Sequence, residues 1–360
     1  MKNKNMSRVK RIGILVVLAL IIATFVIVPM LNKPKIEDEI IASEFTFQDN
    51  LAVTFGKKVP LSFKILADGI LSSKVYVNDS LLKTWNNPKG QISFTLDVSI
   101  FGLGAKTISL VSNLKNGEEQ TDARLIRILS DESPKSMNAI VLKSFVHNSS
   151  SFTQGLEFSD GILFESTGLN GKSKIAKVQL ETGIQTNEIG LDATYFGEGI
   201  TILNDKIFQI TWQNQKCFIY DKNTLQVQKD ISYIGEGWGL CNDGKSIIMS
   251  DGTETITFRN PETFQIERTI EVYDQVGPRV KLNELEYING RIFANIWMLD
   301  VIIEIDPKTG KVLSEIDCSD VVKAGKGTGE VLNGIAYNPK NRKTYLTGKN
   351  WSNLLEVEFK

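Results

Sequence analysis

The segment Gly155-Leu156-Glu157-Phe158 introduces a unit that occurs five times along the chain, and this repeat decides the fold. Each unit starts with a small or polar residue, continues into an apolar strand, turns, and adds two or three more strands. The units recur at spacings of roughly 40 to 50 residues, the range expected of propeller blades. The later units begin with Gly199-Ile200-Thr201-Ile202, Gly239-Leu240-Cys241-Asn242, Glu284-Leu285-Glu286-Tyr287 and Gly334-Ile335-Ala336-Tyr337. The pattern predicts a five-bladed β-propeller over residues 137–360.

Turn residues separate the strands within each unit. Asp160-Gly161 and Asn289-Gly290 are typical of tight turns between antiparallel strands, and similar pairs occur in the other units. A second turn follows later in four of the units, as in Glu181-Thr182-Gly183. The fifth unit ends at the C-terminus instead. Residues around Asn138 to Val146 are therefore expected to supply a strand that closes the ring with the last blade.

Residues 36–132 show a different strand pattern. Short runs of alternating polarity predict an antiparallel sandwich of about the size of an immunoglobulin-like domain. The runs are Val59–Leu66, Lys74–Val77, Gln91–Leu96, Lys106–Val111 and Ala123–Leu129. This region contains no cluster of chemically capable groups, so we interpret it as a spacer. Asp131 to Lys135, with Pro134, is the expected linker to the propeller.

Residues 1–35 resemble a membrane anchor. Five basic residues precede an uncharged, mostly apolar run from Ile12 to Leu31. Twenty helical residues span roughly 30 Å, the thickness of the hydrocarbon core, and the basic flank places the N-terminus in the cytoplasm. The chain is thus predicted to be membrane-anchored with its body extracytoplasmic. A cleaved signal peptide is the alternative and would make the protein secreted.

Composition excludes several classes of function. A formal net charge of −1 gives no basic field for nucleic acid. The three cysteines, Cys217, Cys241 and Cys318, are too few and too widely spaced for a disulfide scaffold or a CxxC metal site. His147 is the single histidine, which argues against Ser-His-Asp triads, Cys-His pairs and most catalytic zinc sites. Catalysis here must use carboxylates, lysine, tyrosine or amide groups.

Equivalent positions in the five units should converge at one mouth of the propeller channel. Glu198 and Glu236 each lie between two glycines there, where indole walls would raise the pKa of a carboxylate toward neutrality. The glycines could equally serve only to permit tight turns. The tryptophans Trp212, Trp238, Trp297 and Trp351 could line a binding wall or belong to the core between blades. Other polar residues at this end have the same two interpretations, as binding groups or as structural and surface groups: Asn283, Asn333 and Lys349.

From Met137 to the C-terminus the chain resembles the plant-type glutamine cyclotransferase family. The matching strings include Phe152-Thr153-Gln154-Gly155-Leu156-Glu157, Tyr195-Phe196-Gly197-Glu198-Gly199, Thr211-Trp212, Gly235-Glu236-Gly237-Trp238-Gly239-Leu240, Leu282-Asn283-Glu284-Leu285-Glu286-Tyr287, Ala294-Asn295-Ile296-Trp297 and Leu332-Asn333-Gly334-Ile335-Ala336-Tyr337. The lysine match rests on Thr347-Gly348-Lys349. The resemblance implies an all-β, five-bladed propeller and a glutaminyl-peptide cyclotransferase, an aminoacyltransferase that acts on N-terminal glutamine of peptides or proteins without a metal or an organic cofactor.

The resemblance also implies residue roles. Glu198 looks like the catalytic acid/base, and eight residues look like the substrate pocket: Phe152, Gln154, Phe196, Trp212, Trp238, Asn283, Trp297 and Lys349. Cyclisation fits this inventory, because the α-amine attacks the γ-carboxamide of the same residue and no protein nucleophile is required. One carboxylate can transfer the proton, and Asn283 or Lys349 can stabilise the oxyanion.

Two other interpretations stay open. A propeller hydrolase or lactonase would need metal ligands at the channel, for which Asp251 and Glu286 are candidates. A non-enzymatic surface propeller that binds protein or glycan is the second, because the fold alone does not establish catalysis.

Overall fold

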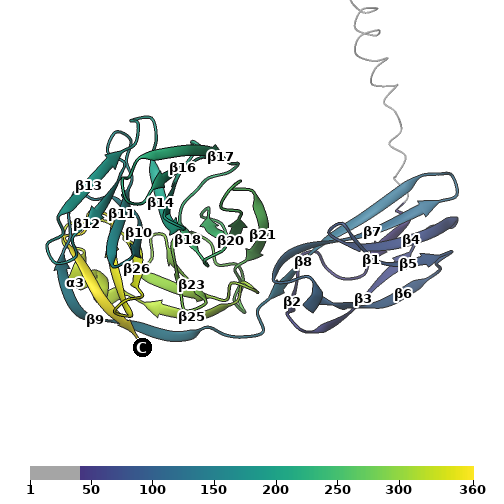
Figure 1. Cartoon of the computed structure of the whole chain (residues 1–360). Helices are drawn as coiled ribbons and strands as arrows, with labels where there is room; N and C mark the ends of the chain where they lie inside the picture. The colour runs from purple at the N-terminus through teal and green to yellow at the C-terminus, as the bar shows by residue number, and fades with distance from the viewer. Residues whose placement is uncertain (1–40) are drawn as a thin grey trace, which may run out of the picture.

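The computed structural model describes residues 41–360, and Figure 1 shows two β-rich units joined by a single connection. Strands dominate both units, and the only α-helix in this range is α3 (Ser319–Gly325). The all-β prediction is confirmed. The segment proposed as an anchor, Ile12 to Leu31, lies outside the described residues. Within residues 41–360, no helix has the length and apolar character required to cross a membrane.

The first unit contains two packed sheets. A three-stranded sheet has the order β1-β3-β6, and a five-stranded sheet has the order β2-β8-β7-β4-β5. The strands are β1 (Ser43–Phe45), β2 (Leu51–Thr54), β3 (Lys58–Ile65), β4 (Ile70–Val77), β5 (Ser80–Asn86), β6 (Gln91–Asp97), β7 (Gly104–Leu114) and β8 (Glu119–Leu129). Buried and less buried residues alternate along β7, as expected for a strand with one face on a core. Inward residues such as Phe63, Leu96 and Ile108 form that core.

All five strand runs expected in this unit are present, and three short strands were missed. β1, β2 and β5 have few or no buried apolar side chains, so their sequences show little alternation. β2 pairs parallel to β8 and is therefore held by a strand distant in the sequence. Local periodicity does not predict such pairing.

The second unit consists of five four-stranded groups arranged in a ring (Figure 1). Three groups are separate antiparallel sheets: β10 (Thr153–Ser159) to β13 (Gln185–Gly190), β14 (Gly197–Leu203) to β17 (Val227–Ser232), and β18 (Leu240–Asn242) to β21 (Ile266–Glu271). Their middle strands are β11 (Ile162–Thr167), β12 (Lys174–Val178), β15 (Lys206–Thr211), β16 (Lys216–Asp221), β19 (Ile247–Ser250) and β20 (Thr255–Arg259). The innermost strands touch in a closed cycle, β10 to β14 to β18 to β22 (Leu282–Ile288) to β26 (Leu332–Asn338) and back to β10.

The remaining two groups are joined into one eight-stranded sheet by β9 (Lys135–Val146). Its first residues pair parallel to β25 (Val312–Asp317), and the rest pair antiparallel to β28 (Asn353–Phe359). The other strands of this sheet are β22 (Leu282–Ile288), β23 (Arg291–Ile296), β24 (Val301–Ile305), β25 (Val312–Asp317), β26 (Leu332–Asn338), β27 (Lys343–Gly348) and β28 (Asn353–Phe359). The expected closing strand thus exists. It begins at Lys135, so the segment between β8 and β9 is residues 130–134, shifted by one residue from the predicted linker.

Glycines let the inner strands approach one another closely. A Cβ on Gly155 would meet the backbone nitrogen of Ile200 at 2.5 Å, and one on Gly199 would meet that of Leu240 at 2.5 Å. Real Cβ atoms do not come so close to a neighbouring backbone. Gly239 is in the same situation against the Asn283 carbonyl oxygen, so three of the four repeated units that begin with glycine do so where backbone lies directly against backbone.

The two units contact each other through charged and apolar groups. The ammonium of Lys106 lies 2.9 Å from Glu271 Oε1, and the backbone nitrogen of Ala105 donates to Glu271 Oε2 at 2.9 Å. Gly104 has φ +103°, and a Cβ there would overlap the Glu271 carboxylate. Tyr273, from the ring, packs into the apolar core of the first unit.

Candidate active site

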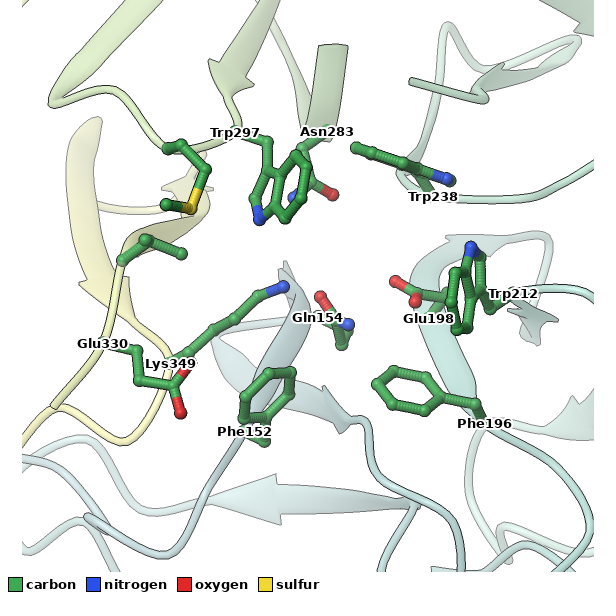
Figure 2. Close-up of a pocket in the computed structure, with 12 residues that line it drawn as sticks. Phe152, Gln154, Phe196, Glu198, Trp212, Trp238, Asn283, Trp297, Glu330 and Lys349 are labelled. Carbon is green, nitrogen blue, oxygen red and sulfur yellow. The ribbon is translucent and has the colours of Figure 1, made fainter. Parts of the chain in front are cut away.

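One cavity of about 300 Å³ opens at the end of the ring where the inner strands begin (Figure 2). All nine residues predicted for the site line it, so side chains up to 197 positions apart in the sequence meet there. They are Phe152, Gln154, Phe196, Glu198, Trp212, Trp238, Asn283, Trp297 and Lys349. Three residues that the sequence analysis missed also line it: Met298, Glu330 and Val331.

The repeat explains why these residues converge. Gln154, Glu198 and Asn283 lie near the first residue of inner strands β10, β14 and β22. Trp212 and Trp297 directly follow the second strand of their groups, β15 and β23, and Lys349 directly follows β27. Second strands run antiparallel to inner strands, so the end of one lies beside the start of the other. The cavity is therefore built from equivalent positions in successive groups.

Glu330 and Glu198 both line this cavity, but Glu330 is exposed, whereas Glu198 is buried. Its side chain is 6% exposed, and burial raises its pKa well above the usual value. The positive charge of Lys349 opposes this rise, while the negative charge of Glu236 adds to it. The backbone is fixed on both sides, because Ser166 Oγ donates to the Glu198 carbonyl at 2.6 Å and Gly199 N donates to the Trp238 carbonyl at 2.9 Å. Glu198 is thus a carboxyl group on a firmly held backbone, and its raised pKa suits it to accept and return a proton.

Lys349 faces the same space from the opposite side (Figure 2). Burial lowers its pKa, and attraction to Glu198 and Glu330 partly restores it. Its ammonium nitrogen lies 4.8 Å from the centre of the Phe152 ring, a cation–π distance. Within residues 41–360, neither Lys349 nor Glu198 forms an ion pair within 4 Å. The two charges therefore act across the cavity, where a substrate would lie between them.

Aromatic rings form the walls. Phe196 packs edge-to-face against Phe152, with ring centres 6.2 Å apart, and against Trp212 at 5.9 Å. Trp238 packs edge-to-face against Trp297 at 5.5 Å. These contacts are the preferred geometry for aromatic pairs and hold the rings in place. The cavity is consequently apolar in most of its lining, with few polar groups to orient a ligand.

Of the four tryptophans in the ring, Trp351 is the one that does not reach the cavity. It is completely buried, and its Nε1 donates to the Glu330 carbonyl at 3.1 Å. Its ring fills space that Gly325, Gly329 and Gly348 leave open. The core alternative is therefore correct for Trp351, and the wall alternative describes the other three tryptophans.

Two amides have distinct positions. Asn333 Nδ2 donates to the Thr153 carbonyl at 2.9 Å and to Gln154 Oε1 at 3.2 Å, so Asn333 connects neighbouring groups and does not line the cavity. The carbonyl oxygen of Gln154 is thus engaged, and its amide nitrogen is the donor that it can offer to a ligand. Asn283 is 3% exposed and lines the cavity directly.

The other acidic residues at the channel have structural partners. Glu165 accepts hydrogen bonds from His147, Ser151, Thr153 and Gln185. Glu284 accepts from the backbone nitrogens of Leu156 and Ile335, and Glu286 from that of Tyr337. Each of these carboxylates therefore connects its own strand to other segments of the ring, and Glu165 does so where the first and last groups meet. Glu198 differs from them because it faces the cavity.

The proposed metal ligands do not form a site. Asp251 accepts from the backbone nitrogen and hydroxyl of Thr253 in a turn, and Glu286 is bound to backbone as described. Among residues 41–360, no group of three or more His, Cys, Asp or Glu side chains is placed to hold a metal ion. The three cysteines are buried, unpaired thiols. The hydrolase interpretation therefore lacks a ligand set in this part of the chain.

Comparisons with known proteins agree with this geometry. A family model described as glutamine cyclotransferase matches residues 108–359. A glutaminyl-peptide cyclotransferase of Arabidopsis thaliana is 40% identical over 228 residues, which are 61% of this chain and 71% of the plant protein. The crystal structure of Myxococcus xanthus glutaminyl cyclase aligns with a TM-score of 0.60 at 34% identity and covers 63% of this chain and 98% of that one.

Proposed function

We propose a residue-level mechanism for this chain, which belongs to the glutamine cyclotransferase family. The enzyme is a glutaminyl-peptide cyclotransferase, and it converts N-terminal glutamine to pyroglutamate. Glu198 is the acid/base of this reaction. The observation that carries the assignment is a buried carboxyl group of raised pKa inside an aromatic cavity of about 300 Å³.

Binding prepares the nucleophile. A peptide α-amine has a pKa of about 8 and enters largely as an ammonium ion. Glu198 accepts one of its protons, which becomes easier because burial raises the carboxyl pKa toward that of the amine. The neutral amine then attacks the γ-carboxamide carbon of the same residue. The aromatic walls hold the glutamine methylenes folded, and this positioning supplies much of the acceleration of an intramolecular reaction.

Proton transfer completes the reaction. Attack forms the ring C–N bond and places negative charge on the former carbonyl oxygen. Asn283, the amide nitrogen of Gln154 and the ammonium of Lys349 are the donors on the cavity wall that can stabilise this oxyanion. Glu198 gives its proton to the leaving nitrogen and takes one from the ring nitrogen. The oxyanion re-forms the carbonyl as the bond to the leaving nitrogen breaks. The departing ammonia takes up the proton that Glu198 still holds, and the carboxylate is restored. Every step uses groups of this chain, so we propose that the reaction is metal-independent.

A direct assay tests the assignment. The fragment from residue 36 onward is incubated with a short peptide that begins with glutamine, and ammonia release and the loss of 17 Da are followed. We expect activity in wild-type and EDTA-treated protein. Glu198→Gln should reduce kcat by about 10²–10⁴, the usual contribution of general acid/base catalysis. Full activity in a folded Glu198→Gln variant contradicts the assignment of the acid/base. Absence of ammonia with folded wild type instead favours a binding protein.

The same proposal extends to the architecture. We assign the five four-stranded groups as the blades of a five-bladed β-propeller over residues 137–360, and residues 36–132 as an immunoglobulin-like spacer. The closed cycle of inner strands and the closing strand β9 support the first assignment. Two sheets packed on one core support the second.

We also propose that residues 1–35 anchor the enzyme in a membrane with the catalytic unit outside the cytoplasm. The basic flank and the apolar run from Ile12 to Leu31 support this placement. Membrane fractionation and the intact mass of the protein purified from cells separate the possibilities. A membrane-bound chain that retains its N-terminus supports an anchor, whereas a soluble, shortened chain supports a cleaved signal peptide.

A further inference from the structure

Glu236 lies outside the cavity but contacts two of its walls. Its Oε2 accepts hydrogen bonds from Trp212 Nε1 at 2.8 Å and from Trp238 Nε1 at 3.1 Å. Its Oε1 accepts from Gln213 Nε2 at 3.0 Å. One carboxylate thus binds the indoles of two tryptophans that come from different sheets of the ring.

The loop that carries Glu236 is itself fixed. Gly235 has φ +99°, a conformation that favours glycine. The backbone nitrogen of Gly237 donates to the Trp212 carbonyl at 3.1 Å, and a Cβ on Gly237 would overlap the Tyr233 hydroxyl. The carboxylate therefore reaches the indoles from a defined backbone position.

These bonds determine what the indoles can do. An indole has a single polar hydrogen, and in both tryptophans Glu236 accepts it. Trp212 and Trp238 consequently present apolar faces to the cavity and offer no hydrogen-bond donor to the substrate. Each ring also packs on a second aromatic wall, Trp212 on Phe196 and Trp238 on Trp297. Glu236 thus orients Trp212 and Trp238 directly, and it orients Phe196 and Trp297 through the contacts of these two indoles.

We propose that Glu236 is a positioning residue that orients the aromatic walls around the substrate glutamine and places a fixed negative charge behind them. This inference rests on the proposed function of Glu198. The charge is stable, because the three donated hydrogen bonds outweigh burial and lower the Glu236 pKa. Its proximity also contributes to the raised pKa of Glu198. Glu236 therefore acts through two routes, the geometry of the walls and the basicity of the catalytic carboxyl group.

Two substitutions separate these routes. Glu236→Ala removes the acceptor and the charge. Glu236→Gln removes the charge but keeps an oxygen that can accept from the indoles. Glu267→Gln serves as the matched control, since Glu267 is an exposed carboxylate that contacts Ser246 and Asn260 and no aromatic wall. All are assayed with the same glutamine peptide, with steady-state kinetics over pH and tryptophan fluorescence.

We expect Glu236→Ala to lower kcat/KM by about 10- to 100-fold, because small displacements of positioning groups have effects of this size. Glu236→Gln should recover part of that loss. In both variants the acid limb of the kcat/KM profile should move to lower pH, because removal of the negative charge lowers the Glu198 pKa. A change in the alanine variant's tryptophan emission should accompany the loss, and Glu267→Gln should behave as wild type.

Wild-type kinetics, pH profile and emission in a folded Glu236→Ala variant would overturn the proposal. If Glu236→Ala fails to fold, the pH profile of Glu236→Gln tests the proposal instead. An unshifted acid limb together with an unchanged kcat/KM in Glu236→Gln would refute the positioning role of Glu236. Failure here is distinguishable from failure of the proposed function, because Glu198→Gln tests the acid/base independently in the same assay.

Discussion

Replacement of His147 by alanine should destabilise the ring at its closure. His147 directly follows β9 and contacts both groups that meet there. Its Nε2 lies 3.0 Å from Glu165 Oε1 in the first group, and its Nδ1 lies 2.9 Å from the Trp351 carbonyl in the last. The two side chains are 1% and 0% exposed. Both partners of the imidazole are acceptors, so an imidazolium that donates from both nitrogens fits the site.

The electrostatics support a charged pair. Burial alone would lower the His147 pKa, but the charge and hydrogen bond of Glu165 outweigh it, and the net pKa is raised. Burial alone would raise the Glu165 pKa, but His147 and the neutral donors lower it overall. Loss of one partner from a buried pair costs about 3–5 kcal/mol. Glu165 would keep donors from Ser151, Thr153 and Gln185, so we expect the lower end, about 3 kcal/mol.

The sign of the pH dependence follows from both shifts. The histidine contribution is fully present below its unfolded pKa, about 6.5, and is lost as pH rises through the raised folded value. The glutamate contribution is present above about 4.5 and is lost as pH falls through the lowered folded value. The difference between wild type and His147→Ala should therefore be largest at about pH 5 to 6.5.

Equilibrium unfolding in urea, followed by tryptophan fluorescence, measures this difference. Lys143→Ala is the control, because Lys143 lies on β9, just before His147, and forms an exposed pair with Glu181 at 3.4 Å. Such pairs contribute about 0–1 kcal/mol. A His147→Ala variant within 1 kcal/mol of wild type at pH 6 would refute the reasoning. Because His147 is the only histidine, proton NMR of its imidazole reads the folded pKa directly, and a value below 6.5 would equally contradict the charged pair.

Three further predictions concern the cavity. Gly168→Ala should lower kcat/KM by roughly tenfold or more with the fold retained by circular dichroism, because its Cβ would overlap the Phe196 ring. Lys349→Met should lower kcat by about 10²–10³ if the ammonium stabilises the oxyanion, and an unchanged kcat would exclude that role. Glu198→Gln should become progressively more stable than wild type in thermal melts as pH rises above about 4.5. The reason is that the wild-type fold is destabilised when a carboxyl group with a raised folded pKa ionises. A stability difference that stays constant with pH would contradict the raised pKa.

Much of the fold and the site could be predicted from local pattern. The repeat located every inner strand to within two residues of its start, since an apolar segment after a small residue and before a turn needs no distant partner to be recognised. It also predicted that equivalent positions in the repeated units meet at one end, and the family resemblance selected the nine residues that line the cavity there. Met298, Glu330 and Val331 were missed although two of them follow the repeat: Val331 directly precedes β26, as Phe196 precedes β14, and Met298 directly follows Trp297.

The sequence by itself determined the strand-rich class, the order of the repeated units and the chemical types available to the site. The tertiary structure decided which of the candidate residues face the cavity and which have structural partners elsewhere. Glu198 and Glu236 have the same glycine flanks, yet one faces the cavity and the other binds two indoles outside it. Trp351 was indistinguishable from the wall tryptophans until its burial was seen. The physical reason is that burial, hydrogen-bond partners and pKa depend on groups distant in the sequence, and local periodicity carries no information about them.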